Sequence, residues 1–479
     1  MALSQGGSFV VNFGGSVVMA RLLSPREMGV YAVAVAIVGI LAVLRSLGLN
    51  TFIIREPQLT PSLLATTFTI NAALAAASSI LLLVSSSFAG WTMGDSGVTH
   101  ILQVLALSPI VSAFEFLPAA YIERTGAFRV IGAINLSRGA VGVATTITLA
   151  WFGNSYMSIA WGNLASVVFG AIAMSVMGRP FLQLRVGLSE WKRVGTFGTQ
   201  MLTLNIIGSL QERLFDILLG RVVGLSSLGL YSRASGLNTL LWDNLHVVIA
   251  RILFVDFAER RRRGISLHDS YLQVLAILTA LLWPAFAGLA ILAGPIIYTV
   301  YGPQWTAAAL PLSLLSIAGI FYVAVTMTWE LYIVHGAMAA QLRFQIKRTS
   351  AAICLFTAGC FGGLNWAAAA RVADSLVTII LARGDIQRFT DTKPADYRPI
   401  YLQSAGLTVL ACGPAAIVMG ANSCSEETGL TSIFCAVLVG VLSWLAGLRV
   451  LRHPLQDELQ RAVRQVVSLL RTRRTSRLH

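Results

Sequence analysis

The stretch from Tyr271 to Trp329 contains no Asp, Glu, Lys or Arg over its 59 residues. A helix that crosses the hydrocarbon core of a bilayer needs about 20 apolar residues, so this stretch is far longer than a single crossing requires. Across the whole chain only 12% of residues are charged and 56% are hydrophobic, whereas a soluble domain carries about 25% charged residues. The composition therefore predicts an integral membrane protein.

Helices are the expected form of the spanning segments, because a membrane barrel would show segments of about ten residues with alternating polarity. Charges and turn motifs such as LSPREMG, REPQLTP and YGPQW separate the apolar segments. We therefore predict an all-α fold with about fourteen transmembrane helices, near residues 5–22, 29–50, 63–89, 99–121, 130–151, 156–178, 195–220, 230–257, 271–300, 306–334, 349–363, 365–382, 399–420 and 429–450.

Basic residues alternate between the two sides of this arrangement. Loops after even-numbered segments, together with the C-terminal tail, hold 25 Lys and Arg, whereas loops after odd-numbered segments hold only Arg21, Arg26 and Arg221. Cytoplasmic loops carry the excess of Lys and Arg in membrane proteins. Both termini are therefore predicted to lie in the cytoplasm, and we attribute the net charge of +14 to topology and not to nucleic-acid binding.

Catalytic and metal-binding motifs are not evident in the sequence. There is no HExxH, Walker loop or DxD pair, and the loops on the predicted outer side are too short to fold as a domain with its own core. The five cysteines include no CxxC pair, so we interpret them as small packing residues. We expect neither an enzyme nor a resident cofactor or metal ion.

Several charged residues lie inside or at the edge of the apolar segments. A charge at mid-bilayer costs about 2.5–3.5 kcal/mol on insertion scales, so it normally faces a partner or a water-filled cavity. For Arg45 and Arg251, near cytoplasmic ends, extension of the side chain to the headgroups is an equal alternative. The basic residues of this class are Arg45, Arg138, Arg213, Arg233, Arg251, Arg371 and Arg449, and the acidic ones are Glu115, Glu212, Asp216, Asp243, Glu330 and Asp374.

The seventh segment carries an ordered polar pattern. Asn205, Ser209, Glu212 and Asp216 follow one another at steps of four, three and four residues, which places them in one stripe along a helix. Arg213 lies beside this stripe, three residues before Asp216. The pattern indicates a helix that lines a wet cavity. The alternative is an internal ion pair between Arg213 and Asp216 that only fixes packing.

The C-terminal segment PLQDELQRAVRQVVSLLRTRRTSRLH differs from the rest. Leu455, Leu459, Val463, Val466 and Leu470 recur at helical spacing between basic residues. Two interpretations remain open at this point. One is an interfacial amphipathic helix held by anionic lipid. The other is a basic tail that serves only to set the topology.

Several motifs resemble one known family. ARLLSPREMGVYAVA resembles the ARLLSPxxFGLYAL signature of bacterial polysaccharide-export flippases, and SLGLNTFIIREPQLT is similar to their DLGLxxALIQxxxLT element. RLFDILLGRVVGLSSLGLYSRA resembles DxLLIGxxLGxxxLGxYxRA, with Asp216, Gly220, Gly224 and Tyr231 in register. RILFVDFAE and YGPQWTAAALPLSLLSIAG are similar to two later motifs, so that the likeness extends from about residue 20 to 335.

These flippases belong to the multidrug, oligosaccharidyl-lipid and polysaccharide exporter superfamily. The resemblance implies two six-helix lobes around a central cavity, related by a pseudo-two-fold axis along the membrane normal. In this chain the lobes would be residues 1–193 and 194–395, followed by two additional helices at 396–451 and the basic tail at 452–479.

The resemblance also implies a function. It is the transport of an undecaprenyl-diphosphate-linked oligosaccharide across the bacterial inner membrane, for exopolysaccharide, capsule or O-antigen assembly. Guanidinium groups match phosphate oxygens bidentately, and the predicted diphosphate contacts are Arg213, Arg138 and Arg371, with Arg45, Arg233 and Arg251 further out. The residues predicted to balance charge, or to couple transport to a proton or sodium gradient, are Asp216, Glu212, Glu115 and Asp374, and the predicted polar cavity residues are Asn205 and Ser209.

The expected partners are the lipid-linked oligosaccharide and membrane lipids, together with a polysaccharide polymerase and glycosyltransferases. One alternative function is a multidrug or small-cation antiporter of the same superfamily. A cation substrate would favour an acidic cavity, and the seven internal basic residues against six acidic ones disfavour it. A further alternative is a membrane scaffold for polysaccharide enzymes that transports nothing.

Overall fold

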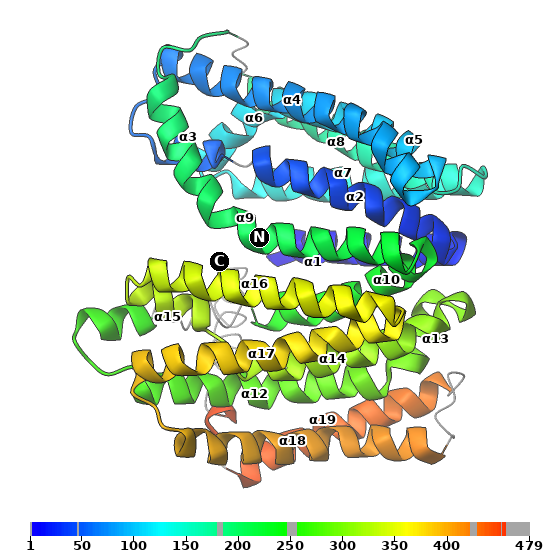
Figure 1. Cartoon of the computed structure of the whole chain (residues 1–479), viewed down its shortest axis with the longest axis vertical. Coiled ribbons are helices and arrows are strands. Elements are labelled where there is room, and N and C mark those ends of the chain that lie inside the picture. Colours follow the sequence, from blue (N-terminus) through cyan, green and yellow to red (C-terminus); the bar gives the residue numbers. More distant parts are fainter. Residues whose placement is uncertain are drawn as a thin grey trace, which may run out of the picture. The chain divides into compact units, whose positions relative to one another are not determined.

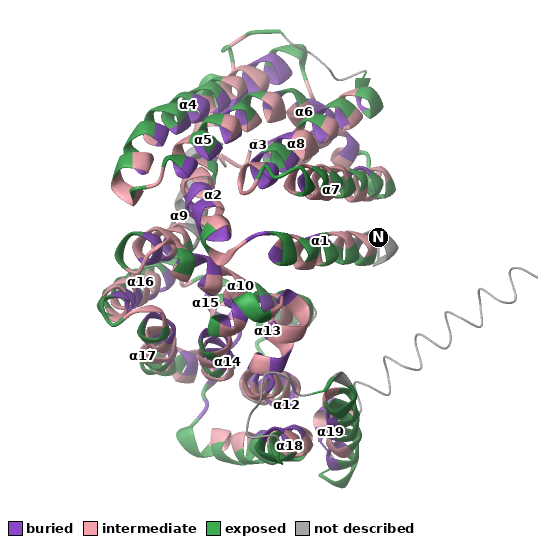
Figure 2. Ribbon diagram, turned by 90° about the vertical axis from the view of Figure 1, so that its right-hand side faces the viewer, coloured by how far each residue is buried: buried purple, intermediate pink, exposed green. Residues whose placement is uncertain are grey.

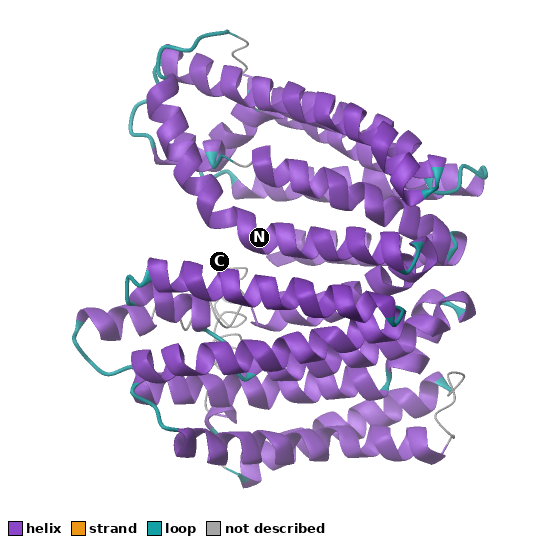
Figure 3. Ribbon diagram, in the orientation of Figure 1, coloured by secondary structure: helices purple, strands orange, loops and turns teal. Residues whose placement is uncertain are grey.

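The computed structural model describes residues 2–45, 47–179, 185–246, 256–421, 429–451 and 453–456. For residues 2–5, 44, 197, 199–209, 245, 246 and 430 it describes the backbone alone. Within these ranges all regular elements are helical (Figure 1 and Figure 3). The predicted all-α fold is therefore confirmed.

Ten helical stretches of the described chain are long and apolar enough to cross a bilayer, namely Pro25–Val43, Pro61–Met93, Ser96–Arg124, Phe128–Trp151, Met157–Met177, His268–Ile291, Pro303–Val334, Leu364–Thr390, Pro394–Ala421 and Thr431–Val450. Four further helices, α1 (Ala2–Leu22), α9 (Trp191–Val222), α10 (Leu225–Leu241) and α16 (Met338–Phe361), occupy the positions of the other predicted segments. Their sequences are richer in charged, glycine or hydroxyl residues. The order of all these helices matches the predicted segments.

Exposed residues, green in Figure 2, lie along many of the helices, and many of these exposed residues are large and apolar. Ile80, Val84 and Phe88 on α4 (Pro61–Met93) are 60%, 52% and 66% exposed, and Phe434 on α19 (Leu430–Val450) is 69% exposed. In water such faces would be interaction or aggregation sites. Against acyl chains they need no cover, which is consistent with helices that face lipid.

The chain divides into two compact units. Unit 1 comprises Met1–Ser232 with Val300–Gln304, and unit 2 comprises Arg233–Thr299 with Trp305–His479. Besides α1, α4, α9 and the start of α10, the helices of unit 1 are α2 (Pro25–Arg45), α3 (Leu49–Arg55), α5 (Ser96–Leu105), α6 (Leu107–Arg124), α7 (Phe128–Trp151) and α8 (Met157–Met177). Helix α7 packs against α1 and α8, and α6 packs against α4 and α8. Helix α2 packs against α4, α5 and α9.

In unit 2, α12 packs against α14 and α18, and α17 lies beside α14 and α16 (Figure 1). The core holds the fully buried rings of Tyr271, Phe286 and Tyr332. The elements of this part of the chain are η2 (Trp242–His246), α12 (His268–Ile291), α13 (Ala293–Tyr301), η3 (Pro303–Ala308), α14 (Ala309–Val323), α15 (Thr328–Val334), α16, α17 (Leu364–Thr390), α18 (Pro394–Ala421) and α19.

The helix α9 groups with unit 1, although the sequence resemblance assigns it to the second lobe. It does so because it packs along α2 and α4. The predicted lobe boundary at residue 193 concerns two structurally related halves of the chain, whereas the two units are defined by which helices touch. The boundary therefore remains a prediction. The helices α18 and α19, expected as an additional pair, pack against each other, and α18 also packs against α12.

The start of α4 shows how a predicted separator ends one helix and begins the next. The REPQLTP motif leads into Thr60, whose backbone is extended and whose hydroxyl accepts a hydrogen bond from the Leu63 amide at 3.2 Å. Pro61 occupies the first helical turn, where its missing N–H leaves no hydrogen bond unmade.

Two predicted segments are shorter than the helices that the structure contains. The segments 349–363 and 365–382 correspond to α16, which begins at Met338, and α17, which ends at Thr390. Arg343, Lys347 and Arg388, which the sequence places in loops, therefore lie on helices. Lys and Arg are good helix formers, so an apolar span can continue as a helix into the headgroup region.

The predicted tail is described only at its beginning. Leu455 is buried against Leu407, in the middle of α18, and Leu448, near the end of α19. The other apolar positions of the predicted amphipathic helix, Leu459, Val463, Val466 and Leu470, lie outside the described residues, so both interpretations of the tail stay open.

Two glycines allow the starts of α2 and α10 to touch. A Cβ atom added at Gly29 would lie 1.7 Å from the Leu225 carbonyl oxygen, and one added at Gly229 would lie 1.8 Å from the Pro25 carbonyl oxygen. The two contacts are reciprocal and both are against backbone, which cannot move aside. Small residues allow this kind of close approach between membrane helices.

We expect Gly29→Ala and Gly229→Ala to destabilise the protein, because the added methyl group must force the helices apart. Overpacking costs about 1–3 kcal/mol. The apparent melting temperature of the purified protein should fall for both variants. Gly236→Ala on the same α10 helix is the control, because its Cβ would meet no atom within 4 Å. An equal melting temperature for all three variants would contradict the close contact.

Candidate functional site

The first cluster of charges within the spanning helices lies in unit 1. We call Arg45, Glu115 and Arg138 the Glu115 cluster; they come from α2, α6 and α7. Arg138 Nη1 lies 3.6 Å from Glu115 Oε2, with side chains that are 24% and 18% exposed. Arg45 is also attracted to Glu115, and its Nη1 donates to the Pro109 carbonyl oxygen at 3.4 Å. One carboxylate therefore pairs with Arg138 and attracts Arg45 from a longer distance.

Glycines make room for two of the unit 1 arginines. A Cβ at Gly170 on α8 would lie 2.8 Å from Arg138 Cζ, and a Cβ at Gly39 on α2 would lie 2.5 Å from Arg213 Nε. Each guanidinium thus rests against helix backbone that carries no side chain. Arg213 Nη1 lies 3.9 Å from Asp216 Oδ2. This separation is too long for a hydrogen bond, so the pairing leaves donors of Arg213 available.

The second cluster lies in unit 2 and is more deeply buried. We call Tyr322, Arg348, Arg371 and Asp374 the Asp374 cluster; they come from α14, α16 and α17. Asp374 is 1% exposed, and its Oδ2 accepts from the Tyr322 hydroxyl and from Arg371 Nη1, the latter at 3.4 Å. Arg348 Nη2 donates to the Tyr322 hydroxyl oxygen at 3.4 Å.

The Arg348 guanidinium also lies over the Tyr322 ring, 5.3 Å from its centre, in a cation–π arrangement. Among the described residues, Asp374 Oδ1 and Arg348 Nε have no hydrogen-bond partner although both atoms are buried. Buried polar atoms are rarely left in this state. The Asp374 cluster therefore keeps an unused acceptor and an unused donor at membrane depth.

Arg348 and Tyr322 are not among the residues predicted for the site. Arg348 precedes the predicted segment 349–363, which implies a loop, whereas the residue lies in the third turn of α16. A repeat in the chain contains the signal that would have found it. Arg138 follows Gly126 by 12 residues, and Arg348 follows Gly336 by 12 residues. Both glycines have positive φ, and each precedes a helix of 24 residues by two positions.

The remaining predicted site residues are distributed more widely. Arg233 is partly buried and lies over the Trp305 ring at 5.9 Å, and Glu212 is exposed. Arg251 and the side chains of Asn205 and Ser209 lie outside what the structure describes, so the polar stripe of α9 stays a prediction. Within the described residues, no group of three His, Cys, Asp or Glu side chains could hold a metal ion.

Comparison with known proteins identifies the family. The model of the family described as polysaccharide biosynthesis protein matches residues 18–310, which is more than half of the chain. The chain belongs to this family. The lipopolysaccharide biosynthesis protein WzxC of Escherichia coli (strain K12) is 22% identical over 334 residues, which cover 69% of this chain and 68% of WzxC. The succinoglycan biosynthesis transport protein ExoT of Rhizobium meliloti (strain 1021) is 25% identical over 327 residues, which cover 66% of this chain and 64% of ExoT.

Solved structures show the same fold. A lipid II flippase, MurJ, in an inward closed conformation superposes with a TM-score of 0.72 and 12% identity, over 94% of this chain and 98% of MurJ. A multidrug resistance MATE family transporter in an inward-facing conformation superposes with a TM-score of 0.56 and 14% identity, over 81% of this chain and 96% of the transporter. At these identities the likeness concerns the fold alone.

The resemblance read from the sequence motifs is therefore confirmed. The polysaccharide biosynthesis family and its relatives identify a multi-pass inner-membrane transport protein of polysaccharide biosynthesis, and not an enzyme. The roles of individual arginines and carboxylates remain predictions.

The two acidic residues that pair with an arginine three positions earlier should respond differently to neutralisation. Asp374→Asn should lower the melting temperature of the purified protein strongly, because breaking a buried ion pair costs about 3–5 kcal/mol and Asp374 is 1% exposed. Asp216→Asn is the matched control and should have a smaller effect, since Asp216 is 24% exposed and its pairing is loose. Equal shifts for both variants would contradict the assignment of Asp374 to a structural ion pair.

Proposed function

We propose that this protein moves an undecaprenyl-diphosphate-linked oligosaccharide from the cytoplasmic to the outer leaflet by alternating access, for exopolysaccharide, capsule or O-antigen assembly. Sugar hydroxyls and a diphosphate cannot cross hydrocarbon unaided, because each unpaired polar group costs several kcal/mol there. The observation that supports this function most is the family match over residues 18–310, combined with arginines at membrane depth.

The charge balance of the clusters favours an anionic substrate group. The Glu115 cluster has two arginines for one carboxylate, and so does the Asp374 cluster. Each cluster therefore has a formal charge of +1, which attracts an anionic group such as a diphosphate. Arginine suits this role because its fork of donors matches phosphate oxygens and stays charged at physiological pH.

In this mechanism the arginines bind the diphosphate and the acids hold their positions between transport cycles. Arg138, Arg213 and Arg371 make the principal contacts, and we add Arg348 to them. Arg45, Arg233 and Arg251 act further out. Asp216, Glu212, Glu115 and Asp374 balance the charge or couple transport to a proton or sodium gradient. No cofactor takes part. The predicted central cavity between two lobes would open to one side at a time.

We further propose that both termini are cytoplasmic and that the protein works beside a polysaccharide polymerase and glycosyltransferases. A multidrug antiporter is the weaker alternative, because the MATE transporter shares only the fold and the cationic clusters would repel a cationic drug.

Replacement of Arg213 tests the transport function. Arg213→Ala should reduce polysaccharide export in a deletion strain at least tenfold, since a hydrogen bond to a charged group contributes about 1.5–3 kcal/mol. Arg213→Lys should retain part of the export because the charge remains without the bidentate geometry. The control is Arg221→Ala, which removes the same charge from an exposed position on the same helix. Full export from both Arg213 variants at normal protein level would remove this residue from the mechanism.

Reporter fusions test the orientation. Alkaline phosphatase fused after Gly153, in a predicted outer loop, should be active, whereas the same enzyme fused after His479 should be inactive. A fluorescent protein fused after His479 should fluoresce, because it folds in the cytoplasm. The reversed pattern would refute the predicted topology.

A further inference from the structure

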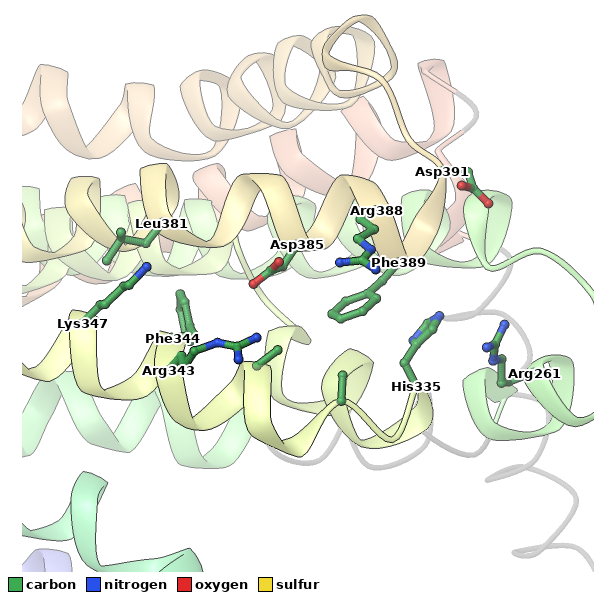
Figure 4. A pocket seen from close by; sticks show the side chains of 12 residues that line it. Arg261, His335, Arg343, Phe344, Lys347, Leu381, Asp385, Arg388, Phe389 and Asp391 are labelled. Atoms are coloured by element: carbon green, nitrogen blue, oxygen red, sulfur yellow. The ribbon is translucent and has the colours of Figure 1, made fainter.

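A basic cavity of about 580 Å³ lies in unit 2, apart from the Asp374 cluster. It is bounded by α16, α17, the end of α15 and the short helical segment at 256–262 (Figure 4). Its charged lining consists of Arg261, Arg343, Lys347, Arg388, Asp385 and Asp391. Asp385 is 11 residues beyond Asp374 on α17, which corresponds to roughly 16 Å along the helix axis.

Helix geometry directs these side chains toward one space. Arg343 and Lys347 are one turn apart on α16, and Asp385 and Arg388 are one turn apart on the facing side of α17. Figure 4 shows both pairs projecting into the gap between the two helices. Helices α16 and α17 follow one another in the chain. Where α16 ends and α17 begins, a Cβ on Gly359 would lie 2.7 Å from the Trp366 carbonyl oxygen. The helices are in close contact there, and the cavity occupies the open end.

One wall of the cavity is held rigidly. The Tyr332 hydroxyl donates to Asp385 Oδ2, and the Tyr332 and Phe389 rings meet edge to face with centres 5.2 Å apart. His335 stacks on Phe389 with ring centres 4.5 Å apart, and its Nδ1 lies 2.9 Å from the Leu331 carbonyl oxygen. The carboxylate of Asp385 is thus engaged within the protein.

The cations that line the cavity outnumber its carboxylates. Among the described residues, no carboxylate lies within 4.0 Å of a charged nitrogen of Arg261, Arg343, Lys347 or Arg388. Four cations and two carboxylates leave a formal charge of +2. Basic residues at the cytoplasmic ends of spanning helices often serve topology alone. Residues that only set the topology need no more than contact with water. The basic residues of this cavity instead converge on a space large enough for a ligand.

We propose that this cavity binds the phosphoryl headgroup of a lipid, of the diphosphate or phosphodiester class, at the cytoplasmic face of the membrane. The cytoplasmic side follows from the proposed topology, whereas the binding itself does not depend on the transport function. A volume of about 580 Å³ accommodates a headgroup with its first substituent, and is larger than a single phosphate needs. Basic pockets between membrane helices recognise lipid headgroups in this way.

Binding is measured on the full-length protein in phosphatidylcholine nanodiscs. The probes are farnesyl diphosphate, inorganic pyrophosphate and inorganic phosphate, and native mass spectrometry detects retained phosphatidylglycerol. The test variant is Arg343→Ala with Arg388→Ala. The control is Arg383→Ala with Arg398→Ala, which removes two exposed arginines of α17 and α18 that do not line this cavity.

The test variant should bind its phosphoryl ligand at least tenfold more weakly, and the control should stay within twofold of the wild type. Selective loss of farnesyl diphosphate binding would identify a prenyl diphosphate as the source of the headgroup, and selective loss of phosphatidylglycerol would identify bulk phospholipid. Should the test variant not fold, Arg261→Gln with Lys347→Gln replaces it. Equal binding by wild type and variant, equal loss in the control, or binding of inorganic phosphate alone would overturn the proposal.

Because the assay contains no transport step, its outcome is separate from that of the export experiment. Loss of export in Arg213→Ala with unchanged headgroup binding would leave both proposals standing. Normal export from the Arg213 variants with lost headgroup binding in the cavity variant would refute only the role of Arg213.

Discussion

A guanidinium group inside a membrane has to find a carboxylate, a hydrogen-bond acceptor or water, and this requirement determines how the helices of the protein are arranged. Arg138 meets Glu115 at 3.6 Å and rests against Gly170, so three helices are held by one ion pair. In unit 2, Arg371 and Asp374 pair within α17, and the Tyr322 hydroxyl joins this pair to α14. Leaving one of these charges alone at mid-bilayer costs about 2.5–3.5 kcal/mol on insertion scales.

The two clusters are built from related parts of the chain. Arg138 and Arg348 occupy the same position after a glycine with positive φ, on helices of equal length. Their partners differ, because Glu115 pairs directly with Arg138 whereas Arg348 reaches Asp374 only through the Tyr322 hydroxyl. The same backbone pattern, a glycine followed by a 24-residue helix, thus holds an arginine in two chemically different environments. Both leave one more cation than anion, which suits a transporter of phosphorylated lipids.

Cations of this protein fall into two physical classes. Those of the clusters are partly buried and lie near a carboxylate or the Tyr322 hydroxyl, because hydrocarbon makes an unpaired charge costly. Those of the basic cavity are exposed and lack a carboxylate partner among the described residues. Water stabilises the second class without a protein partner, so these arginines remain available for an external anion. Burial therefore separates the arginines that the protein's own groups hold between transport cycles from those that have no carboxylate partner among the described residues.

The sequence by itself determined the membrane class, the order of the helices and the family, because apolar runs of about 20 residues and short motifs are local properties. It also identified the pair Arg213–Asp216, since a spacing of three residues places two side chains together on any helix, and the same spacing relates Arg371 to Asp374. Only the tertiary structure showed that Arg348 and Tyr322 join Asp374, that Glu115 receives Arg138, and that α16 and α17 continue into a basic cavity. These contacts join residues on different helices, and helix packing, which hydropathy and spacing do not specify, decides which of them meet.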